Sequence, residues 1–360
     1  MIQATGFEGV SRHWKLSARS SAGPAIARND SVFRAGFSGS SILESQYRQL
    51  QELKTDLEER YDGFCIDEVF HGETMDTPDG SCFRMVTGID EEFTIPSPNE
   101  IRRMLMNDLT LVRGIGPVKA DLLKRRGYRS IEDLRHNKTF RNEAEICEDI
   151  IRCGIPGEVI DLVGLWHPPS HPEVVLSSAL YGQDSFLLVD LETLGFFSRP
   201  IILFGLAEFR DHKLVVLQYL VRDMDEELAA LVETNLRIGQ KKVLVSYNGK
   251  TFDLPYLVSR SAYYGTSPVG PRLHIDLLHV SRRMFGGVVQ DCRLSTIEHH
   301  VLDKSRGVDI PGSVVPEFYE SYQRTGNPGP LIPVVDHNRE DVVTLARLLT
   351  HLPEAGRYGS

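Results

Sequence analysis

The chain has 360 residues, of which 41% are apolar and 25% are charged, and its formal net charge is −10. This length allows one large domain with smaller units, and the composition is that of a globular protein able to bury a sizeable core. Because it has no apolar run of ~18 residues, no apolar signal core at the N-terminus and no CxxC pair among its five cysteines, we expect a reduced, cytoplasmic protein without a membrane span, secretory export or a zinc knuckle.

The first hundred residues divide into an arm and a mixed segment. Residues 1–40 are rich in Ser, Gly, Ala and Arg without periodicity, which predicts a flexible arm. Between residues 42 and 61, apolar residues recur every three or four positions, which predicts an amphipathic helix used for packing. Short strands around a turn at Pro78-Asp79-Gly80 complete residues 41–100, and the sequence gives them no clear role.

Residues 101–180 are expected to form a helical region that ends in a linker. The linker contains LWHPPSHPE, and its Pro and His content marks a domain boundary. His167 and His171 are four residues apart, but the prolines between them exclude a regular helix. We therefore favour a plain loop over a metal site at these histidines.

Small and basic residues interrupt this helical region at residues 109–134, LTLVRGIGPVKADLLKRRGYRSIEDL. Gly114 and Gly116 allow a tight turn, and the N–H groups of the helix that follows can receive a phosphate. The net negative charge taken alone argues against a nucleic-acid binder, but a local basic patch is what contacts phosphate, and Lys119, Arg125 and Arg126 supply one. The stretch resembles a helix-hairpin-helix module, which implies contacts to the phosphate backbone. A hairpin used only for packing or protein contact is the alternative.

The remainder of the chain alternates strands and helices. SFLLVDLET, PIILFGLAEF and KLVVLQYLV predict three successive strands, and strand and helix patterns then alternate as far as the helix NREDVVTLARLLTHL. This order predicts a mixed α/β sheet covered by helices over residues 181–353, followed by a tail at 354–360.

Two acids interrupt the first of these strands. Asp190 and Glu192 are i and i+2, so they share one face about 6.6 Å apart. Neighbouring buried carboxylates repel each other unless a cation lies between them, and Mg²⁺ is the hard cation that prefers such oxygens. The alternative is a strand end at which both acids reach solvent.

Two further acids follow in order. Asp253 lies where a helix begins in VSYNGKTFDLPYL, so it can cap that helix, bind a metal or do both. In DHNREDVVTLARLL, His337 and Asp341 are i and i+4 on one helical face, and Asp341 is in line with the apolar stripe that faces the core. An exposed helix start is the alternative for this motif.

The acid pair, the NGxxFD element and the HxxxD helix form one ordered set. On these motifs and the connecting stretches HIDLLHVSRRMFG, LSTIEHHVL and RGVDIPGSVVPEFYESY, residues 184–352 resemble the ribonuclease-H-like DEDD 3′–5′ exonucleases. Within them the chain looks most like the YprB-type branch, and more distantly like the proofreading domains of family-B DNA polymerases. The resemblance implies a ribonuclease-H-like mixed β-sheet flanked by helices, with the small helix-hairpin-helix domain N-terminal to it.

The resemblance also implies a two-metal phosphodiesterase. Asp190, Glu192, Asp253 and Asp341 would hold two Mg²⁺ or Mn²⁺ ions, and His337 would orient or deprotonate the attacking water. The His subclass of the family has its histidine five residues before the last aspartate, whereas His337 is four before Asp341, the position of tyrosine in the Tyr subclass. The implied reaction is 3′–5′ hydrolysis of single-stranded DNA ends, and DNA repair is the setting that the family suggests.

Other residues and other functions stay open. Asn248 and Lys250 can touch a phosphate, orient Asp253 or simply form the turn, and Asp276 is expected to be structural or to support the site from behind. Because a two-metal site does not distinguish sugars, RNA processing is an alternative to DNA hydrolysis. An inactive nuclease fold that serves as a nucleic-acid-binding adaptor is another alternative, disfavoured because all four acids are present.

Overall fold

The computed structural model describes residues 41–195, 199–268, 270–271, 273–306 and 310–355. The arm expected at residues 1–40 lies outside these ranges, as does the tail after Ala355. The chain divides into two compact units, residues 1–53 and 54–360. Helix α3 (Ser41–Arg60) forms where the sequence predicts the amphipathic helix.

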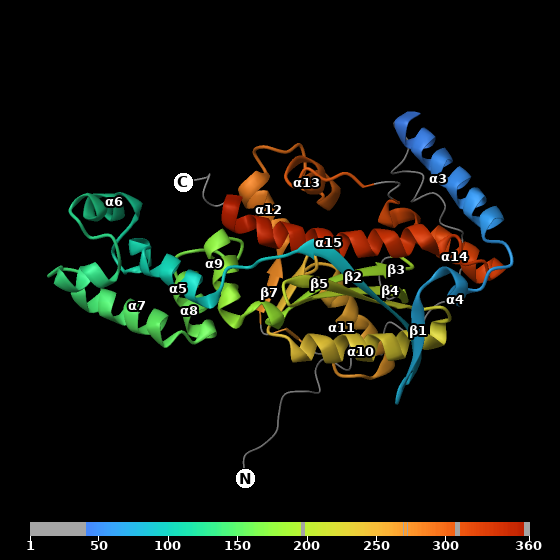
Figure 1. The fold of residues 1–360 in the computed structure, drawn as a ribbon, viewed down its shortest axis with the longest axis horizontal. Helices are drawn as coiled ribbons and strands as arrows, with labels where there is room; N and C mark the ends of the chain where they lie inside the picture. The colour runs from blue at the N-terminus through green and yellow to red at the C-terminus, as the bar shows by residue number, and fades with distance from the viewer. Residues whose placement is uncertain (1–40, 196–198, 269, 272, 307–309, 356–360) are drawn as a thin grey trace, which may run out of the picture. The chain divides into compact units, whose positions relative to one another are not determined.

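The second unit is built around one seven-stranded sheet with the order β1-β2-β5-β4-β3-β6-β7 (Figure 1). The strands are β1 (Gly72–Thr77), β2 (Gly80–Glu92), β3 (Phe186–Thr193), β4 (Ile201–Arg210), β5 (Lys213–Leu220), β6 (Val243–Ser246) and β7 (Leu273–Asp276). Pairing is antiparallel from β1 as far as β3 and parallel from β3 through β6 to β7. Strand β3 therefore lies where the pairing changes from antiparallel to parallel. It extends past the end of β6, which pairs only with residues 186–188 of β3.

The strands before the helical region belong to this same sheet. The expected turn at Pro78-Asp79-Gly80 joins β1 to β2, and Gly80 has a positive φ of 119° that suits glycine. Strand β2 pairs antiparallel with β5 over most of its length. Residues 72–92, whose role could not be predicted from the sequence, thus extend the sheet at its antiparallel edge.

Helices cover both faces of the sheet (Figure 1). Helix α15 (Leu331–Ala355) packs on β3, β4 and β5 from one face, whereas α10 (Glu227–Gln240) and α11 (Asp253–Tyr264) pack from the other. Helix α15 also contacts α9 (Pro172–Ser177), α12 (Leu277–Phe285), α13 (Leu294–His300) and α14 (Val315–Thr325). The remaining short elements of this part are α4 (Ile66–Val69), η5 (Met224–Glu226) and η6 (Gly312–Val314).

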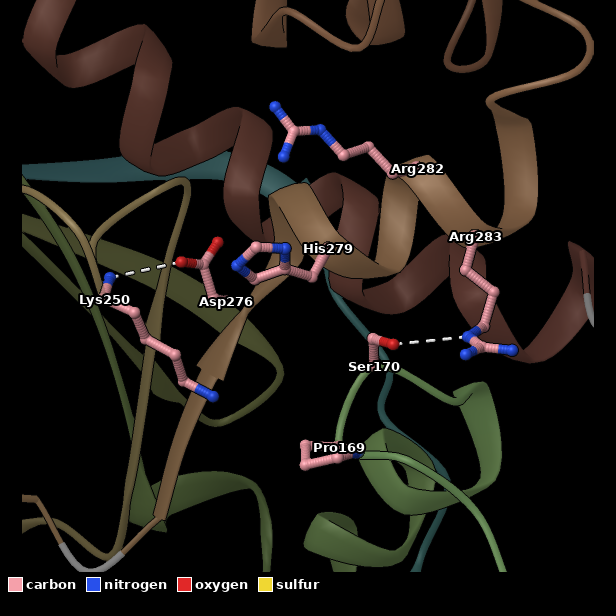
Figure 2. Close-up of a pocket in the computed structure, with 7 residues that line it drawn as sticks. All are labelled: Pro169, Ser170, Lys250, Asp276, His279, Arg282 and Arg283. Atoms are coloured by element: carbon pink, nitrogen blue, oxygen red, sulfur yellow. Dashed lines mark hydrogen bonds between the residues drawn. The ribbon is translucent and has the colours of Figure 1, made fainter.

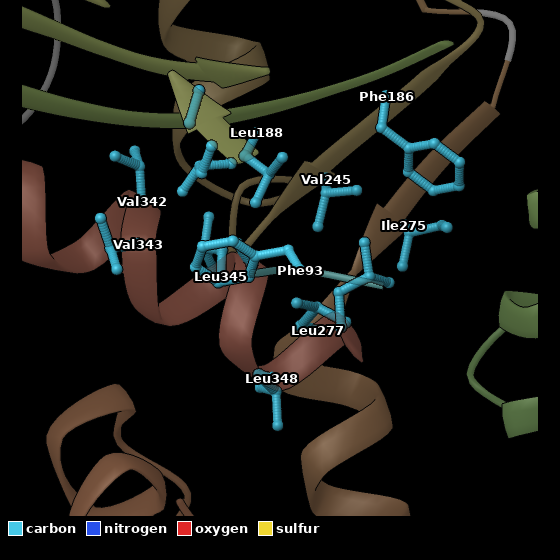
Figure 3. Packing of buried hydrophobic residues seen from close by; sticks show 14 of the residues in the cluster. Phe93, Phe186, Leu188, Val245, Ile275, Leu277, Val342, Val343, Leu345 and Leu348 are labelled. Atoms are coloured by element: carbon cyan, nitrogen blue, oxygen red, sulfur yellow. The ribbon is translucent and has the colours of Figure 1, made fainter. Parts of the chain in front are cut away.

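The alternation of side chains along β3 builds a core on each face. Phe186 and Leu188 pack in one cluster with Leu345 of α15 (Figure 3). Leu187 and Val189 point the other way and join the cluster that contains the apolar residues of α10 and α11. Each such side chain, fully buried, stabilises the fold by roughly 1.5–3 kcal/mol.

The helical region has a core of its own. Its elements are α5 (Pro98–Met106), η1 (Leu109–Leu111), α6 (Pro117–Arg125), η2 (Glu132–His136), α7 (Arg141–Cys153), α8 (Pro156–Gly164), α9 (Pro172–Ser177), η3 (Ser178–Tyr181) and η4 (Gln183–Ser185). Within the expected helical region, the segment shortly before Gly114 is a single 3₁₀ turn, η1, and not an α-helix. The side chain of Asp108 accepts the N–H of Thr110 at 2.9 Å, a local bond that competes with helix continuation.

In the part of the chain that the structure describes, no helix combines the length and the apolar character needed to cross a membrane.

Candidate active site

Strand β3 carries two acids beyond the point where β6 ends. Asp190 and Glu192 continue the row of Phe186 and Leu188, so both carboxylates lie on the face covered by α15. Asp190 is half-buried and Glu192 is buried, so the pair does not lie at a solvent-exposed strand end.

Asp253 approaches the same strand from α11. Its Oδ1 accepts the backbone N–H of Leu191 at 3.1 Å, a donor in the stretch of β3 that β6 does not cover. The N-cap of α11 is Phe252, so Asp253 is the first helical residue and not the cap that its sequence allowed. A Cβ on Gly249 would lie 2.9 Å from Asp253 Oδ2 and 2.3 Å from Ser246 Oγ, so only glycine lets the preceding loop pack this closely.

Helix α15 supplies His337 and Asp341. The helix begins at Leu331, so both residues lie inside it and not at an exposed start. His337 Nε2 is 3.7 Å from Glu192 Oε1 and 3.6 Å from Asp341 Oδ2. The imidazole therefore lies between an acid of the sheet and an acid of the helix.

An amide network that the sequence analysis missed orients Asp190. Asn338 Nδ2 donates to Asp190 Oδ2 at 2.8 Å, and Asn338 Oδ1 accepts from Gln218 Nε2 at 2.9 Å. Gly205 lies between Asp190 and Gln218 in the sheet, and a Cβ there would lie 2.2 Å from Asn338 Oδ1. Gly205 thus leaves the space that Asn338 occupies.

A second missed group, Arg306, pairs with Asp341. Arg306 Nη2 lies 2.5 Å from Asp341 Oδ1, and the same guanidinium donates through Nε to the buried Glu298. Thr344 Oγ1 donates to the other oxygen of Glu298 at 2.8 Å. These bonds fix a positive charge beside Asp341.

The available sequence signals for these missed residues differ. Asn338 directly follows His337 and could have been considered with it, whereas Gly205 and Gln218 lie in apolar strands whose pairing no local pattern specifies. Arg306 precedes an irregular segment and carries no motif of its own.

The carboxylates of this site form a strongly interacting group. Burial and, after it, the charge of Asp341 raise the pKa of Asp190 to about 7. Burial, followed by the charge of Asp190, also raises the pKa of Glu192 and that of Asp253 well above their usual values. The protein alone therefore disfavours the charged form of these three acids.

The donor set fits hard divalent cations. All four acids offer oxygen ligands, which Mg²⁺ and Mn²⁺ prefer. A cation would offset the repulsion that, together with burial, raises the pKa values of Asp190, Glu192 and Asp253. No three of them bring ligand atoms within 4.8 Å of one another among the described residues. This spacing suits different pairs of acids holding different ions better than four acids holding one.

Asp276 supports the site from behind. Its Oδ1 accepts the N–H groups of Asn248 at 2.8 Å and Leu278 at 3.1 Å, and its Oδ2 accepts the N–H of Lys250 at 3.1 Å. Asn248 adopts a positive φ of 63° in this turn. Asp276 thus has a structural role, because it holds the loop that leads into Asp253.

A pocket of about 660 Å³ opens beside this loop (Figure 2). The residues that line it are Pro169, Ser170, Lys250, Asp276, His279, Arg282 and Arg283. Figure 2 shows Lys250 and Asp276 on one side and Ser170 with Arg283 on the other, where Arg283 Nε donates to Ser170 Oγ at 3.2 Å. The pocket lies beside the loop that leads into Asp253, because Lys250 of this loop and Asp276, which binds it, both line the pocket.

The basic residues predicted to contact phosphate form a separate group on α6. Gly114 has a positive φ of 86°, and Gly116 is the N-cap of α6, where a side chain would meet open space. Lys119, Arg125 and Arg126 are exposed. Lys119 Nζ donates to the carbonyl of Gly114 at 2.7 Å, so it also closes the turn.

The sequence of the sheet-containing part matches a known superfamily. Residues 187–353 match the model of the RNase_H superfamily. These residues form a ribonuclease-H-like domain. The mixed sheet flanked by helices that the sequence predicted is confirmed, with β1 and β2 as additional strands.

Two individual proteins are similar to this chain. It is 31% identical over 202 residues to the uncharacterized protein YprB of Bacillus subtilis (strain 168), a match that covers 54% of this chain and 48% of YprB. The chain thus spans about half the length of this curated relative. A solved structure, the family B DNA polymerase from the hyperthermophilic archaeon Pyrobaculum calidifontis, is similar with a TM-score of 0.38 and 18% identity, over 47% of this chain and 24% of the polymerase.

Proposed function

We propose that the ribonuclease-H-like domain is a divalent-metal-dependent 3′–5′ exonuclease that hydrolyses single-stranded DNA ends. The observation that carries the proposal is the crowding of Asp190, Glu192 and Asp253, each of which has a raised pKa. Such acids are costly to keep in a fold unless they bind cations, and perturbed carboxylates of this kind gather at functional sites.

The residues of the site have separable roles. Two Mg²⁺ or Mn²⁺ ions held by Asp190, Glu192, Asp253 and Asp341 would activate a water and stabilise the leaving oxygen. His337 lies within 4 Å of two of these acids and is suited to take the proton of the attacking water.

Cationic surfaces supply the nucleic-acid contacts in this proposal. Lys250, Arg282 and Arg283 line the pocket beside the carboxylates and would hold phosphates of the bound strand. Lys119, Arg125 and Arg126 on α6 would contact a neighbouring stretch of backbone, with little preference for sequence. The 3′–5′ polarity, the preference for DNA and a setting in DNA repair rest on the resemblance of the sequence motifs.

The test is digestion of single-stranded DNA, duplex DNA and single-stranded RNA, each labelled at the 3′ or the 5′ end, with Mg²⁺ or Mn²⁺ and with chelator. We expect immediate release of a mononucleotide from the 3′ label and a ladder of shortening products from the 5′ label. Single-stranded DNA should be the preferred substrate, and chelator should stop the reaction.

Each alternative gives a different result in the same assay. Preferential digestion of RNA would replace the DNA proposal, and release from the 5′ end would reverse the polarity. Binding without degradation under every metal condition would favour the adaptor.

A further inference from the structure

A second group of potential metal ligands lies in the linker, outside the carboxylate site. His167, His171 and Glu173 each bring one ligand atom to a place where all three atoms lie within 4.8 Å of one another. The two imidazole rings are stacked, with centroids 3.9 Å apart and an interplanar angle of 18°. The two histidines thus lie face to face, although the prolines between them exclude a regular helix.

Several polar atoms of this group are enclosed but lack hydrogen bonds. His167 Nε2 and Glu173 Oε2 lie 3.1 Å apart, yet neither atom makes a hydrogen bond to the residues that the structure describes. Asp108 lies next to these atoms, and its charge and a side-chain hydrogen bond both raise the pKa of Glu173. Two acids in contact need a proton or a cation between them, so the group offers a place for a cation.

The donor types are those of a zinc site, and one imidazole would rotate out of the stack on binding, because the in-plane lone pairs of two nearly parallel rings do not converge on one ion. Ligands about 2 Å from a tetrahedral Zn²⁺ lie roughly 3–3.5 Å from one another, and the 3.1 Å between His167 Nε2 and Glu173 Oε2 falls in this range. His171 Nδ1 accepts a long hydrogen bond of 3.3 Å from the N–H of Glu173, and coordination of an ion through Nδ1 would replace this bond. Two imidazoles with a carboxylate suit Zn²⁺, whereas Mg²⁺ prefers sites made of oxygen alone.

We propose that His167, His171 and Glu173 bind one Zn²⁺ ion. Asp108 is outside the set of atoms that lie within 4.8 Å of one another, and its carboxylate would move toward the ion as the fourth ligand. The side chains of His167 and Glu173 keep 21% and 32% of their surface exposed, which leaves an ion a path to the site. The bound ion would tie the linker and the first turn of α9 to the segment that begins η1. Pro169 and Ser170, which line the pocket of Figure 2, lie between the two histidines, so the ion would also fix this wall of the pocket.

The proposal does not rest on the nuclease assignment, and it is tested by metal binding. The full chain is stripped with chelator, supplied with excess Mg²⁺ to occupy the carboxylates, and titrated with Co²⁺, whose intense visible absorption reports a tetrahedral site. We expect one Co²⁺ per chain with this spectrum, and displacement of that Co²⁺ by one equivalent of Zn²⁺.

Variants separate the linker site from the carboxylate site. The double variant His167→Ala/His171→Ala should lose the tetrahedral spectrum, whereas Asp190→Asn/Asp341→Asn and the control variant of an exposed histidine outside the cluster, His136→Ala, should retain it. If removal of both linker histidines leaves the affinity and the spectrum unchanged, or if the native chain shows only the weak absorption of octahedral Co²⁺, the proposal is wrong.

A conservative variant covers the case in which the double variant does not fold. Glu173→Gln keeps the size of the side chain and the stacked imidazoles but removes the anionic ligand. It should weaken Co²⁺ binding by about tenfold or more while the far-ultraviolet circular dichroism stays that of the native chain. Native affinity in the folded Glu173→Gln protein would contradict the assignment.

Discussion

Two groups of acids that are largely shielded from solvent have opposite electrostatic surroundings in this protein. Glu227 of α10 is fully buried, and its carboxylate accepts hydrogen bonds from Ile201 N at 2.9 Å, Arg260 Nε at 2.7 Å and Tyr264 Oη at 2.8 Å. Its charge is therefore matched within the protein. Asp190 and Glu192 lie beside other acids, and their pKa values are raised.

This difference distinguishes a structural acid from a functional one. A carboxylate that the fold supplies with a guanidinium and backbone donors stabilises the native packing around it. A carboxylate that the fold crowds against like charges makes a site for a cation from outside the chain. Removal of the cation that pairs with Glu227 should therefore lower the stability of the fold, whereas removal of the negative charge of Glu192 should not.

The largest expected effect comes from breaking the matched pair. Arg260→Leu leaves the charge of Glu227 buried without its cation, so we expect the free energy of unfolding to fall by about 3–5 kcal/mol in urea titrations. The rate of nucleic-acid cleavage per folded molecule should not change, because among the described residues Arg260 bonds to Glu227 and Tyr264, which are not acids of the candidate site. An exposed ion pair usually contributes less than about 1 kcal/mol. If Arg260→Leu lowers the free energy of unfolding by no more than that, Glu227 is not a buried charge that depends on its cation.

The second prediction concerns the group of Asp190 and Glu192, where a negative charge is removed. Glu192→Gln removes one anionic ligand, so we expect metal-dependent digestion to slow by about 10²–10³-fold, while the free energy of unfolding stays the same or rises. Glu208→Gln is the matched control, since Glu208 is a buried acid of the neighbouring strand β4 that pairs with Lys241 and Arg210. Digestion at the native rate by Glu192→Gln would mean that this acid is not part of a metal site.

The pH dependence of stability gives a third test. Native Asp190 has a pKa of about 7 against a usual value of 3.8, so between pH 7 and pH 4 the native state binds a proton that the unfolded state lacks. Without divalent metal, the free energy of unfolding of the native chain should therefore rise relative to that of Asp190→Asn as the pH falls through this window. In saturating Mg²⁺, the difference in the free energy of unfolding between the native chain and Asp190→Asn should change little with pH. If the two proteins show the same pH dependence without Mg²⁺, Asp190 has an ordinary pKa.

A smaller effect is expected from the amide network. In Gly205→Ala the added methyl group meets Asn338, so we expect a loss of about 1–3 kcal/mol of stability. Displacement of Asn338 from Asp190 should also slow digestion by about tenfold. Gly88→Ala of β2 is the control, because a Cβ there meets no atom within 4 Å. If Gly205→Ala and Gly88→Ala have the same stability and digest DNA at the same rate, Asn338 does not orient Asp190.

The smallest effect concerns the surface of α6. Replacement of Lys119, Arg125 and Arg126 by Ala should weaken DNA binding and reduce the slope of log K against log salt by about 2–3, as expected for the loss of three phosphate contacts. Cleavage at saturating substrate should be nearly unchanged. The control replaces three exposed basic residues elsewhere, namely Arg60, Lys213 and Arg324. A salt slope that matches that of the control would exclude α6 from the binding surface.

The sequence predicts much of this fold because apolar periodicity is a local property. The three strands around Asp190 and the helices α10, α11, α12 and α13 form where their patterns predict them. Helix α15 starts earlier than the motif NREDVV suggests, since Pro333 is tolerated in a first helical turn. The pairing of β2 with β5 could not be predicted, because that contact joins segments separated by the whole helical region.

The candidate site divides in the same way. The four acids and His337 belong to motifs that a reader of the sequence can see. Asn338, Gly205 and Gln218 act through a contact between a helix and two strands, and that contact exists only after folding. The linker histidines carry a signal in their spacing, but their stacking depends on a turn that spacing does not specify.

Anomalous diffraction from a crystal of the full chain soaked in Mn²⁺ tests the metal-site assignment most directly. We predict two anomalous peaks among Asp190, Glu192, Asp253 and Asp341, and the loss of at least one peak in Asp190→Asn. Native crystals that show no anomalous peak at these four acids under saturating Mn²⁺ would contradict the assignment.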